Sequence, residues 1–74
     1  MFAVRLTRYQ QLADELAASI RSGALRPGDR LPSVRDLRRQ RGVSPSTIFQ
    51  AYAQLELQGL VEARVRSGYF VRAR

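Results

Sequence analysis

Arginine and hydroxyl side chains gather in the middle of this sequence, in the stretch RDLRRQRGVSPST that spans residues 35–47. The guanidinium group of arginine is a planar fork of hydrogen-bond donors that fits phosphate oxygens and the edge of guanine. The hydroxyl groups of serine and threonine donate to phosphate oxygens as well. Residues of these types, closely spaced around a glycine and a proline, predict a surface that binds phosphate groups.

The overall charge supports the same interpretation. The chain of 74 residues carries 13 basic residues, all of them arginine, against 6 acidic residues, for a net charge of +7. A domain with this balance attracts polyanions such as nucleic acids. High genomic G+C content is an alternative explanation for the choice of arginine over lysine, but it does not account for the net charge.

The composition excludes several classes of chemistry. Because the chain has no cysteine and no histidine, disulfide bonds, thiolate catalysis and nearly every transition-metal site are excluded. Asp14 and Glu15 have no partner base or metal ligand, and we interpret them as the solvent face of a helix. No apolar run approaches the roughly 20 residues of a membrane span, and residues 1–7 are too short for a signal peptide. We therefore expect no enzyme, no cofactor in this chain and no membrane partner.

An amphipathic helix is predicted over residues 9–20. Thr7 is suited to cap its start, and Gly23 to end it in a left-handed conformation. The glycine and proline residues of GALRPGDRLP then favour a loop, with a short extended piece at Arg30 and Leu31. The inward positions of the helix recur at helical spacing: Tyr9, Leu12, Ala13, Leu16, Ala17 and Ile20.

A second, shorter helix is predicted after this loop. Ser33 is suited to cap its start and Gly42 to close it. Val34 and Leu37 face inward, and Val43 is positioned to fold back on Leu37. The outward positions are arginines: Arg35, Arg38, Arg39 and Arg41.

A third helix is predicted over residues 44–58. Ser44 is suited to cap it, Pro45 fits the first helical position, and Gly59 provides the stop. Two helices joined by so short a turn are typical of a helix-turn-helix unit, whose second helix enters the DNA major groove. The inward stripe of the third helix consists of Ile48, Ala51, Tyr52 and Leu55.

A β-hairpin is predicted after the third helix. Apolar and polar residues alternate over residues 61–66, and the run YFVR is aromatic and β-branched. The turn is placed at residues 66–68, where Gly68 can adopt a positive φ. The predicted fold is mainly α (α+β), a winged helix-turn-helix in which three helices precede a two-stranded wing. One domain spans residues 1–74, with its core in residues 8–72.

Particular side chains of this fold are candidates to contact nucleic acid. Arg35 is the strongest phosphate candidate, with an ion pair to Asp36 or Glu62 as the alternative. Phe49 and Gln50 lie outside the buried stripe near the start of the third helix. A glutamine can bond adenine, and an aromatic edge can touch a thymine methyl group. The alternative for Phe49 is packing against the wing or the second helix.

The start of the third helix and the wing are further candidates. The hydroxyls of Ser44, Ser46 and Thr47, with exposed amides at Ser46 and Thr47, are suited to phosphate. Arg64, Arg66 and the adjacent Ser-Gly pair are placed to reach a minor groove, or else to form a solvated hairpin tip. Three aromatic residues are expected in the core or in strand pairs: Tyr52, Tyr69 and Phe70.

Four stretches resemble the N-terminal DNA-binding domain of the GntR family of bacterial transcription regulators. They are YQQLADELAASIRSGALRPGDRLPSVRDL, GVSPSTIFQAY, LELQGLVEA and RVRSGYFV, and the resemblance covers residues 9–71. RSGYFV and QAYAQLELQGLVEAR are most similar to the MocR-type and related subgroups. The resemblance implies a sequence-specific regulator that binds double-stranded operator DNA as a homodimer, with the third helix (44–58) in the major groove and the wing (64–69) at the minor groove.

The resemblance also carries site residues onto this chain. In the family, DNA is contacted by the arginine after LPS, the hydroxyls at the start of the recognition helix and the wing glycine. Family members usually have an arginine where this chain has Pro45, and another where it has Phe49 or Gln50. The base-reading chemistry therefore departs from the family pattern here. The positions that match are Arg35, Ser44, Ser46, Thr47 and Gly68.

Features outside these 74 residues are implied as well. GntR regulators carry a C-terminal domain that binds a metabolite and mediates dimerisation; in the MocR type it holds pyridoxal phosphate. We therefore expect a fragment of a longer regulator, monomeric or weakly dimeric, from the bacterial cytoplasm and associated with the nucleoid. The alternative is a winged helix that binds another protein or RNA through its arginines, since the fold alone does not decide the partner.

Overall fold

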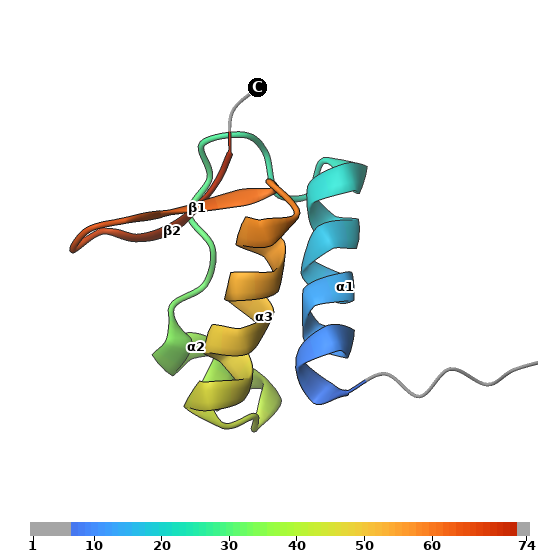
Figure 1. Cartoon of the computed structure of the whole chain (residues 1–74), viewed down its shortest axis with the longest axis vertical. Helices are drawn as coiled ribbons and strands as arrows, with labels where there is room; N and C mark the ends of the chain where they lie inside the picture. Colours follow the sequence, from blue (N-terminus) through green and yellow to red (C-terminus); the bar gives the residue numbers. More distant parts are fainter. Residues whose placement is uncertain (1–6, 73–74) are drawn as a thin grey trace, which may run out of the picture.

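The computed structural model describes residues 7–72, which form three helices followed by a β-hairpin (Figure 1). The helices are α1 (Arg8–Ser22), α2 (Val34–Arg41) and α3 (Pro45–Leu57), and the strands are β1 (Val61–Arg64) and β2 (Gly68–Val71). Helices α1 and α3 lie side by side, α2 packs against α3, and the hairpin projects from one side of the molecule (Figure 1). The predicted winged helix-turn-helix is confirmed.

The ends of α1 and α2 are set by the residues expected from the sequence. The Thr7 hydroxyl accepts a hydrogen bond from the Gln10 amide (3.3 Å), and the Gln10 side chain accepts one from the Thr7 amide (2.9 Å). Gly23 ends α1 in the left-handed region, at φ 89°. The Ser33 hydroxyl caps α2 by accepting from the Asp36 amide (3.1 Å). Each side-chain cap of this kind contributes about 1 kcal/mol.

The hydrophobic core lies between α1, α3 and one face of the sheet. Both predicted helical stripes belong to it, with Tyr9 and Ile20 half-buried at its edge. No charged residue in the described range is buried, so the arginines there remain at the surface. The buried residues are Leu12, Ala13, Leu16, Ala17, Leu31, Leu37, Ile48, Ala51, Tyr52, Leu55, Val61 and Val71.

The wing is anchored by a third extended segment. Strands β1 and β2 pair antiparallel, and the predicted extended piece before α2 is confirmed, because Arg30 forms a bridge with Phe70 on the other edge of β2. Backbone hydrogen bonds flank this bridge on both sides. The Leu31 amide donates to the Tyr69 carbonyl oxygen, and the Val71 amide donates to the Asp29 carbonyl oxygen, each at 2.8 Å. A two-stranded hairpin alone is only marginally stable in water. These bonds therefore hold the wing to the helical body.

The wing turn lies one residue earlier than predicted. Gly68 pairs with Arg64 as the first residue of β2, so residues 65–67 form the turn, closed by a 3.1 Å hydrogen bond from the Ser67 amide to the Arg64 carbonyl oxygen. Gly68 has the expected positive φ (108°), and Arg66 also lies in the left-handed region (φ 65°). Val65 does not continue the inward face of the strand but is 89% exposed.

No helix within residues 7–72 is long and apolar enough to cross a lipid bilayer. Helix α1, with 15 residues, is shorter than the roughly 20 residues that a span requires.

Tyr52 connects α3 to the wing and to the loop before α2. Its ring centroid lies 4.7 Å from that of Tyr69, with the rings tilted by 59°, and its hydroxyl donates to the Pro32 carbonyl oxygen. Burial, with smaller contributions from Tyr69 and Asp36, raises the pKa of Tyr52 well above its usual range. The phenol therefore stays neutral and keeps its hydrogen bond. The prediction that Tyr52 and Tyr69 belong to the core and the sheet is confirmed.

We expect Tyr52→Phe to lower the free energy of unfolding by about 1–3 kcal/mol at neutral pH, because the Pro32 carbonyl loses its donor in a partly buried place. The raised pKa of Tyr52 in the folded state adds stability below pH 10.0 that falls at higher pH, where the unfolded phenol ionises. The difference between wild type and variant should therefore shrink above that pH in urea unfolding followed by circular dichroism. A difference that stays constant up to about pH 11 would contradict this account.

Candidate nucleic-acid interface

Helices α2 and α3 are joined by the short turn predicted from the sequence. Gly42 closes α2 in the left-handed region (φ 65°), and its amide donates to the Arg38 carbonyl oxygen (3.0 Å). Val43 is half-buried and packs against the core that contains Leu37. Ser44 then caps α3. The helix-turn-helix geometry is therefore present, and the start of α3 lies at the surface.

Three hydroxyl groups form one cluster at the start of α3. The Ser44 hydroxyl oxygen lies 3.2 Å from that of Ser46 and 2.9 Å from that of Thr47, and we call this group the hydroxyl cluster. The Thr47 amide donates to the Ser44 hydroxyl (3.3 Å), so this amide takes part in the predicted cap. Ser44 and Ser46 are exposed. The cluster therefore presents hydroxyls, with the positive end of the helix dipole behind them.

Arg35 lies exposed in the first turn of α2. The alternative of an ion pair with Asp36 or Glu62 is not realised, because the ion pairs of the described residues do not include Arg35. Glu62 pairs instead with Arg64, at 3.8 Å. The Arg35 guanidinium is therefore available to a ligand.

Arg41 differs from the other arginines of α2. Its guanidinium forms an ion pair with Glu15 of α1, and Glu15 lies on the solvent face of its helix as expected. The two side chains are 42% and 53% exposed, and a pair this exposed contributes at most about 1 kcal/mol. The pair restrains Arg41 toward α1, whereas Arg38 and Arg39 are exposed without an ion-pair partner in residues 7–72.

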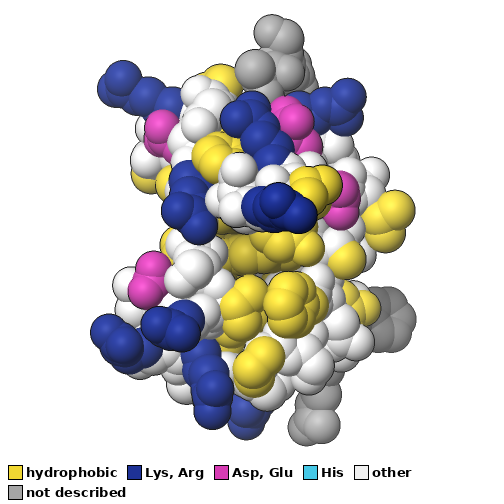
Figure 2. Space-filling view, turned by 90° about the vertical axis from the view of Figure 1, so that its left-hand side faces the viewer, with side chains coloured by type: hydrophobic (Ala, Val, Ile, Leu, Met, Phe, Trp, Pro, Cys, Tyr) yellow, Lys and Arg dark blue, Asp and Glu magenta, His cyan; other side chains and the backbone are white. Residues whose placement is uncertain are grey.

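The side of the molecule that carries the wing alternates between charged and apolar areas. Figure 2 shows arginine side chains in a group at the lower left and in others above, with hydrophobic side chains between them. Phe49 is 51% exposed and lines a hollow of about 200 Å³ together with Val34, Tyr69 and Gly68, which we call the Phe49 hollow. Phe49 thus lies beside residues of α2 and the wing with about half of its surface exposed, and its contact with a base stays a prediction.

The wing carries its arginines in two environments. The guanidinium carbon of Arg64 lies 4.4 Å from the centroid of the Phe70 ring, and its Nε lies 3.8 Å from the Glu62 carboxylate. Phe70 pairs with Glu62 across the strands, as expected of a strand-pair residue. Arg66 is exposed in the turn and makes no ion pair with the rest of the described chain. Arg64 is thus held on the wing, and Arg66 is available at its tip.

The structure gathers some of the predicted site residues and leaves others separate. The three hydroxyl residues form one cluster, and Phe49 and Gly68 line one hollow. The remaining predicted site residues are exposed but belong to neither group: Arg35, Gln50 and Arg66.

Arg30 lies beside the candidate site, although the sequence alone does not select it. Its guanidinium lies against Gly68 of the wing. A Cβ atom added to Gly68 would be only 3.2 Å from Arg30 Nε. Arg30 also lines the Phe49 hollow. The feature that could have indicated it is the neighbouring Leu31: if Leu31 is buried in an extended segment, Arg30 points to the opposite face.

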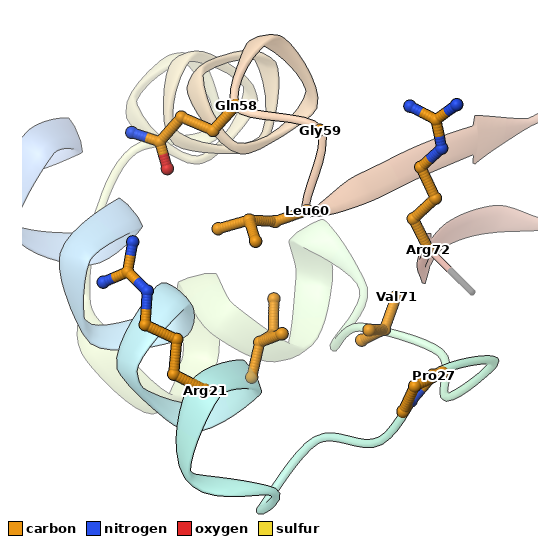
Figure 3. Close-up of a pocket in the computed structure, with 8 residues that line it drawn as sticks. Arg21, Pro27, Gln58, Gly59, Leu60, Val71 and Arg72 are labelled. Atoms are coloured by element: carbon orange, nitrogen blue, oxygen red, sulfur yellow. The ribbon is translucent and has the colours of Figure 1, made fainter. Parts of the chain in front are cut away.

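A second hollow, of about 660 Å³, lies at the other end of α3. Leu60, Val71 and Pro27 line it, and Arg21 and Arg72 stand on different sides of it (Figure 3). Neither arginine takes part in an ion pair of the described residues. Arg21 is therefore a matched comparison, in charge and exposure, for the arginines near the start of α3.

Comparison with known proteins is consistent with this geometry. Residues 8–71 match the family model of bacterial regulatory proteins, gntR family. The chain is 52% identical over 69 residues to the uncharacterized HTH-type transcriptional regulator YjiR of Escherichia coli, which covers 93% of this chain and 15% of that protein. It is 46% identical over 63 residues to the HTH-type transcriptional regulator Rv1152 of Mycobacterium tuberculosis, covering 85% of this chain and 52% of that protein. The chain thus spans only part of these curated relatives.

A solved structure gives the same result for the fold. The DNA-binding domain of AraR in complex with operator ORR3 is similar with a TM-score of 0.87 and 32% identity, over 96% of this chain and 86% of that one. The family match extends over α1, α2, α3 and both strands. The chain therefore belongs to the GntR family of bacterial regulatory proteins, in which it is a DNA-binding domain and not an enzyme.

Proposed function

We propose that this domain recognises double-stranded operator DNA in a sequence-specific way, as the DNA-binding module of a transcription regulator. The recognition segment 44–58 enters the major groove, and the wing at 64–69 meets the adjacent minor groove. The observation that carries the proposal is the exposed hydroxyl cluster at the start of α3. A short turn joins it to α2, whose Arg35, Arg38 and Arg39 lack ion-pair partners within residues 7–72. The AraR domain of the same fold is in complex with its operator, which supports this use of the surface.

One set of residues would hold the DNA backbone without reading its sequence. Guanidinium and hydroxyl groups donate to phosphate oxygens, and these contacts set the register of the protein on the duplex. Gly68 would let the backbone approach the wing closely, because it has no side chain. The members of this set are Arg35, Ser44, Ser46, Thr47, Arg66 and Gly68.

Two residues of α3 would read bases. The half-exposed ring of Phe49 would contact a thymine methyl group, and the exposed amide of Gln50 would form two hydrogen bonds with adenine. Arginine is the usual reader of guanine, and this chain has Phe49 and Gln50 where the family usually places one. We therefore expect the operator to favour A·T pairs at the positions that α3 reads.

The intact regulator is proposed to be of the MocR type and to bind its operator as a homodimer in the bacterial cytoplasm, at the nucleoid. The similarity of its wing and recognition helix to that subgroup supports this type. The match to YjiR covers only 15% of that protein, which supports a regulator longer than this chain. Pyridoxal phosphate does not fit these residues, because proteins hold it as a Schiff base with a lysine and all 13 basic residues here are arginine. Such a cofactor would be held by another part of the protein.

Replacing Arg35 tests the placement of the backbone contacts. We expect Arg35→Ala to weaken binding to every duplex by about three- to tenfold at low salt and to reduce the slope of log K against log salt by about 0.9, because one phosphate contact is lost. Fluorescence anisotropy titrations over a range of salt concentrations measure both quantities.

Two control variants sharpen this test. Arg21→Ala removes the same charge at the other end of α3 and should leave the salt slope unchanged. Gln50→Ala should also keep the slope but reduce discrimination against the wrong base by about 1–3 kcal/mol. Equal effects of Arg35→Ala and Arg21→Ala would show that only net charge matters and that Arg35 is misplaced. Binding to RNA or to an acidic protein in preference to any duplex would favour the alternative function.

Removing a methyl group from the DNA tests the role of Phe49. The operator is first selected from a random duplex pool, and each thymine in it is then replaced by uracil, which lacks only that methyl. One replacement should weaken binding of the wild type by about 0.8 kcal/mol, roughly fourfold. The same replacement should have no effect on Phe49→Ala. Equal losses in both proteins, at every thymine, would exclude a methyl contact by Phe49.

The isolated domain should be monomeric in solution and should occupy a two-site operator as two copies. Helix-turn-helix dimers bind half-sites about one helical turn apart, roughly 34–36 Å, so two copies of α3 would read the same face of the duplex. Analytical ultracentrifugation with and without DNA measures both states. A stable dimer in the absence of DNA would contradict the first expectation.

A further inference from the structure

We infer that Arg30 contacts the DNA backbone, and that Gly68 leaves open the place in which the Arg30 guanidinium lies. This inference rests on the proposed function. It adds a phosphate contact from the extended segment before α2, which belongs neither to the helix-turn-helix nor to the hairpin of the wing.

The backbone sets the direction of the Arg30 side chain. Arg30 is paired with Phe70 of β2, which is paired in turn with Glu62 of β1. Residues directly opposite one another in a sheet project from the same face. The next residue, Leu31, is buried in the core, and successive side chains of an extended segment point to opposite faces. Arg30 therefore stands on the outer face of the wing sheet.

Gly68 provides the space for the guanidinium. A Cβ atom at this position would lie 3.2 Å from Nε and 3.4 Å from Nη2 of Arg30, so a side chain there would force the guanidinium to shift. The backbone of Gly68 is also in a region that side chains disfavour, at φ 108°. The backbone therefore favours glycine at this position, and the absence of a side chain lets the Arg30 guanidinium lie where it does.

The acidic residues near Arg30 are already engaged. Glu62, in the same row of the sheet, lies 3.8 Å from Arg64. Asp29, the preceding residue, accepts a hydrogen bond from the Arg26 amide (2.8 Å). Arg30 appears in neither ion pair of the described part of the chain. Its donors are therefore available to an external anion, and phosphate suits the planar fork of arginine.

The position of Arg30 identifies which phosphates it would meet. It lines the Phe49 hollow together with Phe49 of α3 and Gly68 of the wing. A single DNA strand separates a major groove from the adjacent minor groove. If α3 occupies the first groove and the wing the second, that strand must pass between them, over the Phe49 hollow. Arg30 would clamp this strand.

The test compares four single variants for binding to the selected operator at several salt concentrations. Arg30→Ala should weaken binding about three- to tenfold and lower the salt slope by about 0.9, as expected for one lost phosphate contact. Arg30→Lys should recover most of the slope, because it keeps a charge at the same place. Arg21→Ala should leave the slope unchanged, and Arg35→Ala should lower it. A purely structural role of Arg30 would reduce the free energy of unfolding and leave the slope as it is.

Ethylation of single phosphates locates the contact. Ethylating a phosphate on the strand between the two grooves should weaken binding of the wild type but add no further loss to Arg30→Ala. If Arg30→Ala behaves like Arg21→Ala while Arg35→Ala lowers the slope, this inference is wrong and the proposed function stands. If neither Arg30→Ala nor Arg35→Ala changes the slope, the proposed placement of DNA fails as well.

Discussion

The Tyr52 side chain links the three parts of the domain that must keep a fixed spacing if the molecule is to straddle DNA. It projects from the buried face of α3, packs its ring against Tyr69 of β2, and donates a hydrogen bond to Pro32 in the loop before α2. That loop in turn forms the third extended segment of the sheet, through Arg30. A wing of two short strands has little stability of its own, so its position relative to the recognition helix depends on these contacts.

The positive charge of the domain is explained better by a ligand than by folding. No charged residue is buried within residues 7–72, and the ion pairs found there are exposed ones, which contribute little to stability. The mutual repulsion of a net charge of +7 works against the compact state. The core, the helix caps and the bonds between the wing and the loop therefore offset that repulsion. An all-arginine surface is useful if phosphate groups neutralise it on binding.

Most of the fold could be predicted from the sequence because it is encoded locally. Thr7, Gly23, Ser33, Gly42 and Ser44 cap or end their helices as expected, since each cap depends only on residues within one turn. Helical spacing likewise identified the buried stripes of α1 and α3.

The features that escaped prediction depend on contacts between distant parts of the chain. The pairing of Glu15 with Arg41 joins two helices, and the place of Arg30 against Gly68 requires the loop before α2 to lie along β2. The turn at residues 65–67 follows from the register of the two strands, which places Gly68 opposite Arg64. The contacts of Phe49 and Arg35 with DNA stay predictions, because they depend on a partner and not on the chain itself.

Nuclear magnetic resonance of the isotope-labelled domain, titrated with a duplex of the selected operator sequence, tests the central claim most directly. The claim is that residues far apart in the chain form one surface that faces a double helix. Backbone amide shifts should change at the starts of α2 and α3, at the turn of the wing and around Arg30, while those around the hollow between Arg21 and Arg72 stay in place. Changes confined to α1 and to that hollow would contradict the account.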